Sequence, residues 1–234
     1  MNTSAAPFYH CWRARLGPVS PDSLALLSAA EREWHGRFLA AEAAQAYAGA
    51  HVFLRNVLSC YAGLPPAALA LSADARQKPI LAAAHPLWFN LSYRAEWALL
   101  AVSNQGEVGV DVEEIRPVAG AGALVDYLFS PAERLVLRTA RPAAWRRLFY
   151  AIWTRKEAWA KRSGMGLALP FVSFSVAQRR CAAVTWRAPG PGQLDGFAVS
   201  ENHVGALACE AEAPVAWQHF DFSSQLSVAA LSFP

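Results

Sequence analysis

Apolar and polar positions along the chain follow a helical period in two long regions, and each region opens with the same motif. The motifs are Ser28-Ala-Ala-Glu31 and Ser130-Pro-Ala-Glu133. A serine followed three residues later by glutamate is typical of a capping box, in which each residue satisfies a backbone N–H of the other. We therefore predict two helical regions, each made of two helices. They span about residues 31–61, broken near Gly49, and about residues 132–163, broken near Pro142.

Runs of apolar, aromatic and β-branched residues follow each helical region. Residues 88–93 and 97–102 have the pattern of a hairpin, and residues 196–200 and 204–209 have the pattern of a second one. The order of capping box, helices and strands thus occurs twice, about a hundred residues apart. Chance matches in an alanine-rich chain would explain this order, but we favour a duplication.

The repeated order predicts an α+β fold of two similar lobes related by pseudo-twofold symmetry, with the active site at the lobe interface. The boundary is expected between Gln105 and Gly106. This places the N-terminal lobe at residues 1–105 and the C-terminal lobe at residues 106–234.

Composition narrows the function classes. Hydrophobic residues make up 54% of the chain and charged residues 17%, which indicates a globular protein. A net charge of +3 is too small to favour nucleic acid as a partner. The four cysteines form no C-x-x-C pair, the N-terminal residues lack the pattern of a signal peptide, and no apolar run approaches the roughly 20 residues of a membrane helix. We expect a cytoplasmic protein with reduced thiols and no membrane association.

Two segments carry candidate chemistry. In Val108-Gly-Val-Asp-Val-Glu-Glu, strand geometry places Asp111 and Glu113 on one face, where a hard cation such as Mg²⁺ would relieve their repulsion. In the second helical region, Glu157 adds a third carboxylate, and Lys156 and Lys161 add charge for phosphate. Taken separately, the first segment is better explained by solvated acids at a strand end, and the second by an ordinary surface ion pair.

Several short motifs resemble those of the two-lobed, surfactin-synthetase-activating type of 4′-phosphopantetheinyl transferase. Residues 109–113 resemble G-[IV]-D-[IV]-E, and residues 153–161 resemble W-[ST]-x-K-E-[AS]-x-x-K. Residues 77–79 resemble G-K-P, residues 89–92 resemble F-N-[LI]-S, and Arg37-Phe38 fits the first lobe. The likeness covers nearly the whole chain, and the second-lobe pair is the most specific.

The resemblance implies an enzyme that moves phosphopantetheine from coenzyme A to a serine of an acyl- or peptidyl-carrier protein and releases 3′,5′-ADP. Asp111, Glu113 and Glu157 would ligate Mg²⁺, with Mn²⁺ as an alternative. Glu157, directly or through a water on the metal, or else a neutral Lys161, would accept the serine proton. The family usually acts as a monomer. Coenzyme A would be bound by residues of both lobes, namely Arg37, Lys78, Pro79, Ser92, Tyr93, Lys156 and Lys161.

The chain departs from the family where the 3′-phosphate of coenzyme A is bound. Tyr93 replaces a frequent histidine, Ala46 lies where a second arginine is usual, and Glu31 and Trp34 lie in a segment that is often lysine-rich. Gln77 replaces the glycine of G-K-P. Selectivity for the 3′-phosphate is therefore expected to be reduced. The alternative function is a non-catalytic or repurposed descendant that binds carrier protein or a related phosphate-containing ligand.

Overall fold

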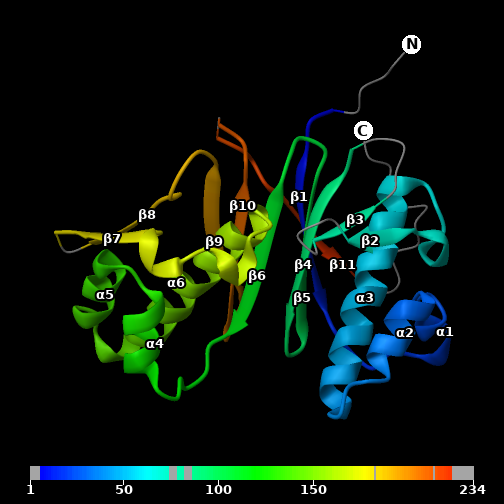
Figure 1. Ribbon diagram of the computed structural model, residues 1–234, viewed down its shortest axis with the longest axis horizontal. Coiled ribbons are helices and arrows are strands. Elements are labelled where there is room, and N and C mark those ends of the chain that lie inside the picture. Colours follow the sequence, from blue (N-terminus) through cyan, green and yellow to red (C-terminus); the bar gives the residue numbers. More distant parts are fainter. Residues whose placement is uncertain (1–5, 74–77, 82–85, 182, 213, 223–234) are drawn as a thin grey trace. The chain divides into compact units, whose positions relative to one another are not determined.

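The computed structural model describes residues 6–73, 78–81, 86–181, 183–212 and 214–222, and its contacts divide the chain into two units. Unit 1 comprises the described residues of Met1–Gln105 and Trp217–Pro234, and unit 2 comprises those of Gly106–Ala216. Both units contain helices and sheets (Figure 1). The α+β class expected from the sequence is thus confirmed, while the pseudo-twofold symmetry stays a prediction.

Unit 1 is built on a four-stranded sheet in the order β11-β1-β5-β4. The β4–β5 hairpin matches the one expected from the sequence, and β5 also pairs antiparallel with β1. The last strand, β11, pairs parallel with β1 although the two are separated by some 200 residues. The strands are β1 (Tyr9–Arg15), β4 (Trp88–Arg94), β5 (Trp97–Ser103) and β11 (Gln218–Phe222).

Helix α3 (Ala41–Ala62) packs on this sheet through Phe53, Leu54 and Val57, which share a core with Trp12 of β1 and with residues of β4 and β5. The helix ends at Gly63, whose left-handed φ of 63° is the conformation that glycine adopts at helix C-termini. The remaining elements of unit 1 are short: α1 (Pro21–Leu24), α2 (Ala29–His35), the 3₁₀ turn η1 (Pro66–Ala68), β2 (Leu71–Ala73) and β3 (Pro79–Leu81).

The break predicted near Gly49 is wrong. The first helical region is interrupted between the end of α2 at His35 and the start of α3 at Ala41, and α3 runs through Gly49 without a break. A Cβ at Gly49 would lie 3.4 Å from the side chain of Leu16. This is ordinary van der Waals contact, and the helix tolerates the cost of about 1 kcal/mol that a glycine adds to a helix interior.

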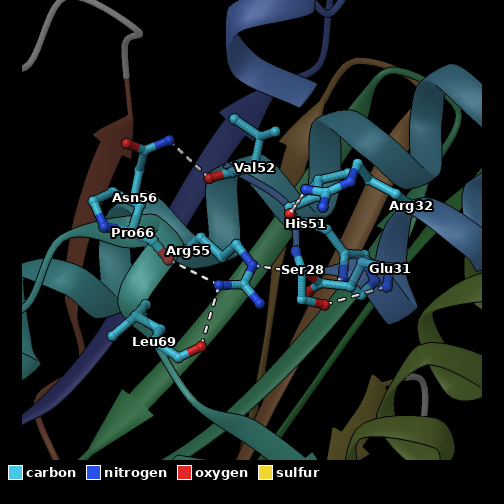
Figure 2. A network of polar contacts seen from close by, with 10 residues as sticks. Ser28, Glu31, Arg32, His51, Val52, Arg55, Asn56, Pro66 and Leu69 are labelled. Carbon is cyan, nitrogen blue, oxygen red and sulfur yellow. Dashed lines mark hydrogen bonds and ion pairs between the residues drawn. The ribbon is translucent and has the colours of Figure 1, made fainter. Parts of the chain in front are cut away.

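The first capping box is confirmed, and its glutamate also anchors a buried arginine (Figure 2). Glu31 accepts from Ser28 N at 2.7 Å and from Arg55 Nε at 2.7 Å, and it lies 3.0 Å from His51 Nδ1. Arg55 Nη1 also donates to the carbonyl of Pro66 at 2.8 Å. These hydrogen bonds lower the pKa of Glu31 to about 2 despite burial, so its carboxylate is ionised and joins α2, α3 and η1.

Unit 2 contains a three-stranded antiparallel sheet in the order β6-β10-β9, and helix α6 packs against it (Figure 1). The β9–β10 pair and the break before Pro142 match the sequence prediction, and the second capping box is present. The elements are β6 (Val108–Glu114), α4 (Ala121–Leu128), α5 (Pro131–Arg138), α6 (Pro142–Arg162), η2 (Gly166–Ala168), η3 (Phe171–Ser173), β7 (Ala177–Arg180), β8 (Ala183–Trp186), β9 (Gln193–Ser200) and β10 (His203–Cys209).

Within the described ranges, no helix combines the length and the apolar character needed to cross a bilayer.

Candidate functional site

Strand β6 presents the two acids of the first motif to helix α6. Val108, Val110 and Val112 are buried and alternate with Gly109, Asp111 and Glu113, which therefore share the other face of the strand. A Cβ at Gly109 would collide with the carbonyl of Ala158 in α6. The face that carries the acids is thus the face on which the helix lies, and Gly109 is what permits the close approach.

Helix α6 presents Trp153, Glu157 and Lys161 to this face of β6. They are four residues apart, which places them on one face of the helix. Trp153 Nε1 donates to Glu113 Oε1 at 3.2 Å, and Lys161 Nζ forms an ion pair of 2.6 Å with Asp111 Oδ1. Glu157 lies between Trp153 and Lys161 in this row. The order of the contacts shows that α6 runs antiparallel to β6.

Glu157 lies in a negative environment. Burial raises its pKa most, and the nearby carboxylates of Asp111 and Glu113 raise it further. Lys161 acts in the opposite direction, but the pKa is still raised to about 7. The side chain is therefore near half-protonation at neutral pH, which suits a group that accepts and returns a proton.

The donor set fits a hard divalent cation in its chemistry. Glu157, whose pKa is raised by burial and by two neighbouring carboxylates, would gain from a cation among the three, and carboxylate oxygen is the ligand that Mg²⁺ prefers. As arranged, however, the described part of the chain holds no group of three or more acidic, histidine or cysteine side chains that forms a metal site. The ammonium of Lys161 supplies the positive charge at Asp111 instead.

Lys156 is placed away from these acids, with its side chain directed into the interior of unit 2. Its side chain is 0% exposed and its Nζ donates to the carbonyls of Phe171 and Phe174, both at 2.6 Å. The third donor forms an ion pair of 2.9 Å with Glu133, which is also 0% exposed. All three N–H groups of Lys156 are therefore used inside unit 2, where they join α6 to α5 and to the segment around η3.

Glu133 is the residue that sequence reasoning missed as a partner. It closes the second capping box with Ser130 and also accepts from Val176 N at 2.8 Å. Only its place in the capping box marks it in the sequence, since the contacts to Lys156 and Val176 join separate elements. The network fixes α5 and the segment before β7 against α6.

The expected coenzyme A residues of the first lobe lie in unit 1. Lys78 is buried, Pro79 opens β3 and is exposed, and Ser92 and Tyr93 lie in β4, buried and half-buried respectively. Arg37 follows α2 and forms an exposed ion pair of 2.5 Å with Glu33. Gln77 lies outside the described residues.

Two of the positions at which the chain departs from the family line one cavity of unit 1. Ala46 of α3 and Tyr93 of β4 both border a space of about 700 Å³. Its charged lining residues are Glu42, Arg94 and Glu96, so acids outnumber bases around it. Burial raises the pKa of Tyr93, which keeps its hydroxyl neutral.

The apolar segment before the second capping box divides between core and surface. Val125 and Phe129 are buried, at 8% and 0% exposure, whereas Leu124 and Tyr127 are exposed on α4. The first two are core residues.

Comparison with known proteins relates the chain to one superfamily. A family model described as the 4′-phosphopantetheinyl transferase superfamily matches residues 107–226. The 4′-phosphopantetheinyl transferase HetI of Nostoc sp. strain PCC 7120 is 34% identical over 165 residues, which cover 68% of this chain and 70% of that protein. A 4′-phosphopantetheinyl transferase of Bacillus subtilis is 32% identical, covering 65% and 67%. The 4′-phosphopantetheinyl transferase AcpT of Salmonella typhi is 43% identical over 96 residues, covering 41% of this chain and 50% of its own length.

Proposed function

Since the chain belongs to the 4′-phosphopantetheinyl transferase superfamily and is an enzyme of that class, we propose that it transfers 4′-phosphopantetheine from coenzyme A to a serine of an acyl- or peptidyl-carrier protein. The other product is 3′,5′-ADP. The observation that carries this proposal is the meeting of Asp111, Glu113, Glu157 and Lys161 on the facing surfaces of β6 and α6.

Asp111, Glu113 and Glu157 are the residues that would hold Mg²⁺, which when bound supplies positive charge to the pyrophosphate of coenzyme A. Trp153 orients Glu113 through its indole N–H. Lys161 contributes a cation at the same face of α6, where it stabilises the charge that develops on the departing phosphate.

Glu157 is the residue that we propose as the base for the carrier serine. In the metal-free protein its pKa of about 7 leaves a large fraction of the carboxylate ionised at neutral pH, with a proton affinity high enough to take up a proton. Lys161 Nζ is already engaged as a donor to Asp111, so it is the weaker candidate.

The test is to incubate the protein with an apo carrier protein, coenzyme A and Mg²⁺ and to record the intact mass of the carrier. A gain of one phosphopantetheine that is lost with a chelator supports the proposal. Glu157→Gln is expected to lower the transfer rate at least about 100-fold. The matched control Glu201→Gln, at an exposed turn of unit 2, is expected to transfer like the wild type. Wild-type protein that binds the carrier tightly without modifying it would favour the non-catalytic alternative.

We further propose that this enzyme discriminates weakly for the 3′-phosphate of its donor. Ala46 and Tyr93 bring no positive charge to the cavity that they line, and the positive charge of Arg94 there is accompanied by the negative charges of Glu42 and Glu96. Glu31 accepts hydrogen bonds from Arg55 Nε and from the backbone N–H of Ser28, and it too brings no positive charge. We expect dephospho-coenzyme A to be accepted with less than a 100-fold loss in kcat/KM, and a larger loss would refute weak discrimination without affecting the transferase activity itself.

A further inference from the structure

A cavity of unit 2 lies beside α6, on the side of the helix away from Glu157. It has a volume of about 390 Å³ and is bordered by one face of α6 and by β9 and β10. Its lining includes the large apolar residues Leu148, Trp186, Phe197 and Val204 and small residues such as Gly196 and Gly205. The volume falls within the range of about 300–1,000 Å³ of small-molecule sites.

Arg155 brings a buried cation to this cavity. Only 8% of its surface is exposed, and its guanidinium lies 3.8 Å above the ring of Trp186. A Cβ at Gly196 would collide with Nη2, so the glycine is what makes room for the guanidinium beside the strand. Trp186 covers one face of the guanidinium.

The donors of Arg155 are largely unused. Nη1 donates to the carbonyl of Ala151 in the same helix at 2.8 Å. Among the described residues, Nε is buried and has no hydrogen-bond partner, and Nη2 makes no hydrogen bond or ion pair. Arginine has five N–H donors, and a buried guanidinium with donors that lack partners in the described part of the protein gains from an anion in the cavity that it lines.

The surrounding charges do not neutralise this cation. Burial lowers the pKa of Arg155 to about 10, against a smaller raising effect of Asp195, so the guanidinium is charged at neutral pH. Asp195 is exposed on β9 and forms no ion pair with Arg155 within the described ranges. A second arginine, Arg147, lines the same cavity and donates to the carbonyl of Glu201 at 2.7 Å.

We propose that this cavity binds a small organic carboxylate, with the carboxylate paired to Arg155 and an apolar body lying against Leu148, Phe197 and Val204. The buried cation selects an anion, and the largely apolar walls favour an organic acid over inorganic phosphate. The site is distinct from the acids of β6, and it does not depend on the transferase proposal.

The test measures direct binding by calorimetry or by NMR shift perturbation, without coenzyme A or carrier protein. Phenylacetate is the probe, phenylacetamide is its neutral match, and inorganic phosphate is the anion without an apolar body. We expect phenylacetate to bind at least tenfold more tightly than either of the other two. Equal binding of acid and amide, equal binding of phosphate, or no binding of phenylacetate up to about 10 mM would overturn the proposal.

Variants locate the site. Arg155→Met is expected to weaken phenylacetate binding at least tenfold, and Arg155→Lys to retain part of it. Arg146→Met is the matched control, because Arg146 is exposed on the same helix and does not line the cavity. Thermal unfolding checks that each variant is folded, and the comparison of acid with amide on the wild type decides the proposal even if Arg155→Met does not fold. Unchanged phenylacetate binding by folded Arg155→Met would refute it.

Discussion

Replacing Glu157 with glutamine should stabilise the metal-free protein at alkaline pH. The pKa of Glu157 is about 7 in the folded protein and 4.5 as the ordinary value, which is used here for the unfolded chain. The folded state therefore holds the proton more tightly than the unfolded state. Stability from this group is fully present below pH 4.5, decreases as the pH rises towards 7, and remains lower above it.

The size of the effect follows from the two pKa values. Each unit of separation corresponds to about 1.4 kcal/mol, so the ionised carboxylate costs about 3–4 kcal/mol once both states are deprotonated. Glutamine keeps the shape of the side chain without the charge. Relative to the wild type, Glu157→Gln should gain about 2 kcal/mol in the free energy of unfolding between pH 5 and pH 8.

Urea unfolding in the presence of a chelator, at both pH values, measures this difference. The exposed control Glu201→Gln should show no comparable change with pH. A wild-type-minus-variant difference that is the same at pH 5 and pH 8 would refute the reasoning, because it would mean that Glu157 ionises alike in the folded and unfolded states. Addition of Mg²⁺ at pH 8 should then stabilise the wild type more than the variant, if the acids bind the ion.

Two further substitutions probe how α6 is held. Lys156→Met leaves the buried carboxylate of Glu133 without its cation and should destabilise the protein by about 3–5 kcal/mol in urea unfolding. Adding Glu133→Gln should restore part of this loss. A loss below about 1 kcal/mol would contradict a buried ion pair. Gly109→Ala forces β6 and α6 apart and should cost about 3 kcal/mol and most of the transfer rate in the carrier mass assay, whereas Gly122→Ala, with no atom near its added Cβ, should be close to neutral in both.

The sequence predicted best what depends on local interactions. Both capping boxes form because Ser28 and Glu31, and likewise Ser130 and Glu133, meet within one turn of helix. The β4 and β5 strands were recognisable from their apolar runs and the short turn between them. Asp111 and Glu113 share a face because strand geometry alternates side chains, and this needs no knowledge of other elements.

The features that the sequence did not reveal depend on contacts between distant segments. The parallel pairing of β11 with β1 joins the two ends of the described chain, and no local pattern marks residues 218–222 as its partner. Lys156 was expected at the nucleotide site because of its charge and of the motif to which it belongs, and its side chain is turned by about 100° from that of the adjacent Glu157. That rotation directs Lys156 to Glu133 and the carbonyls near η3.

The charged residues of α6 face different parts of unit 2. Glu157 and Lys161 face the acids of β6, whereas Arg155 lies beside Trp186 and β9. Lys156, between them in sequence, is tied to Glu133 and has no remaining donor. Because Lys156 fixes the rotation of the helix, a substitution there should disturb both faces together. Loss of transfer accompanied by loss of phenylacetate binding in a folded Lys156→Met variant would therefore identify a change in helix orientation, whereas loss of transfer alone would place Lys156 in the chemistry.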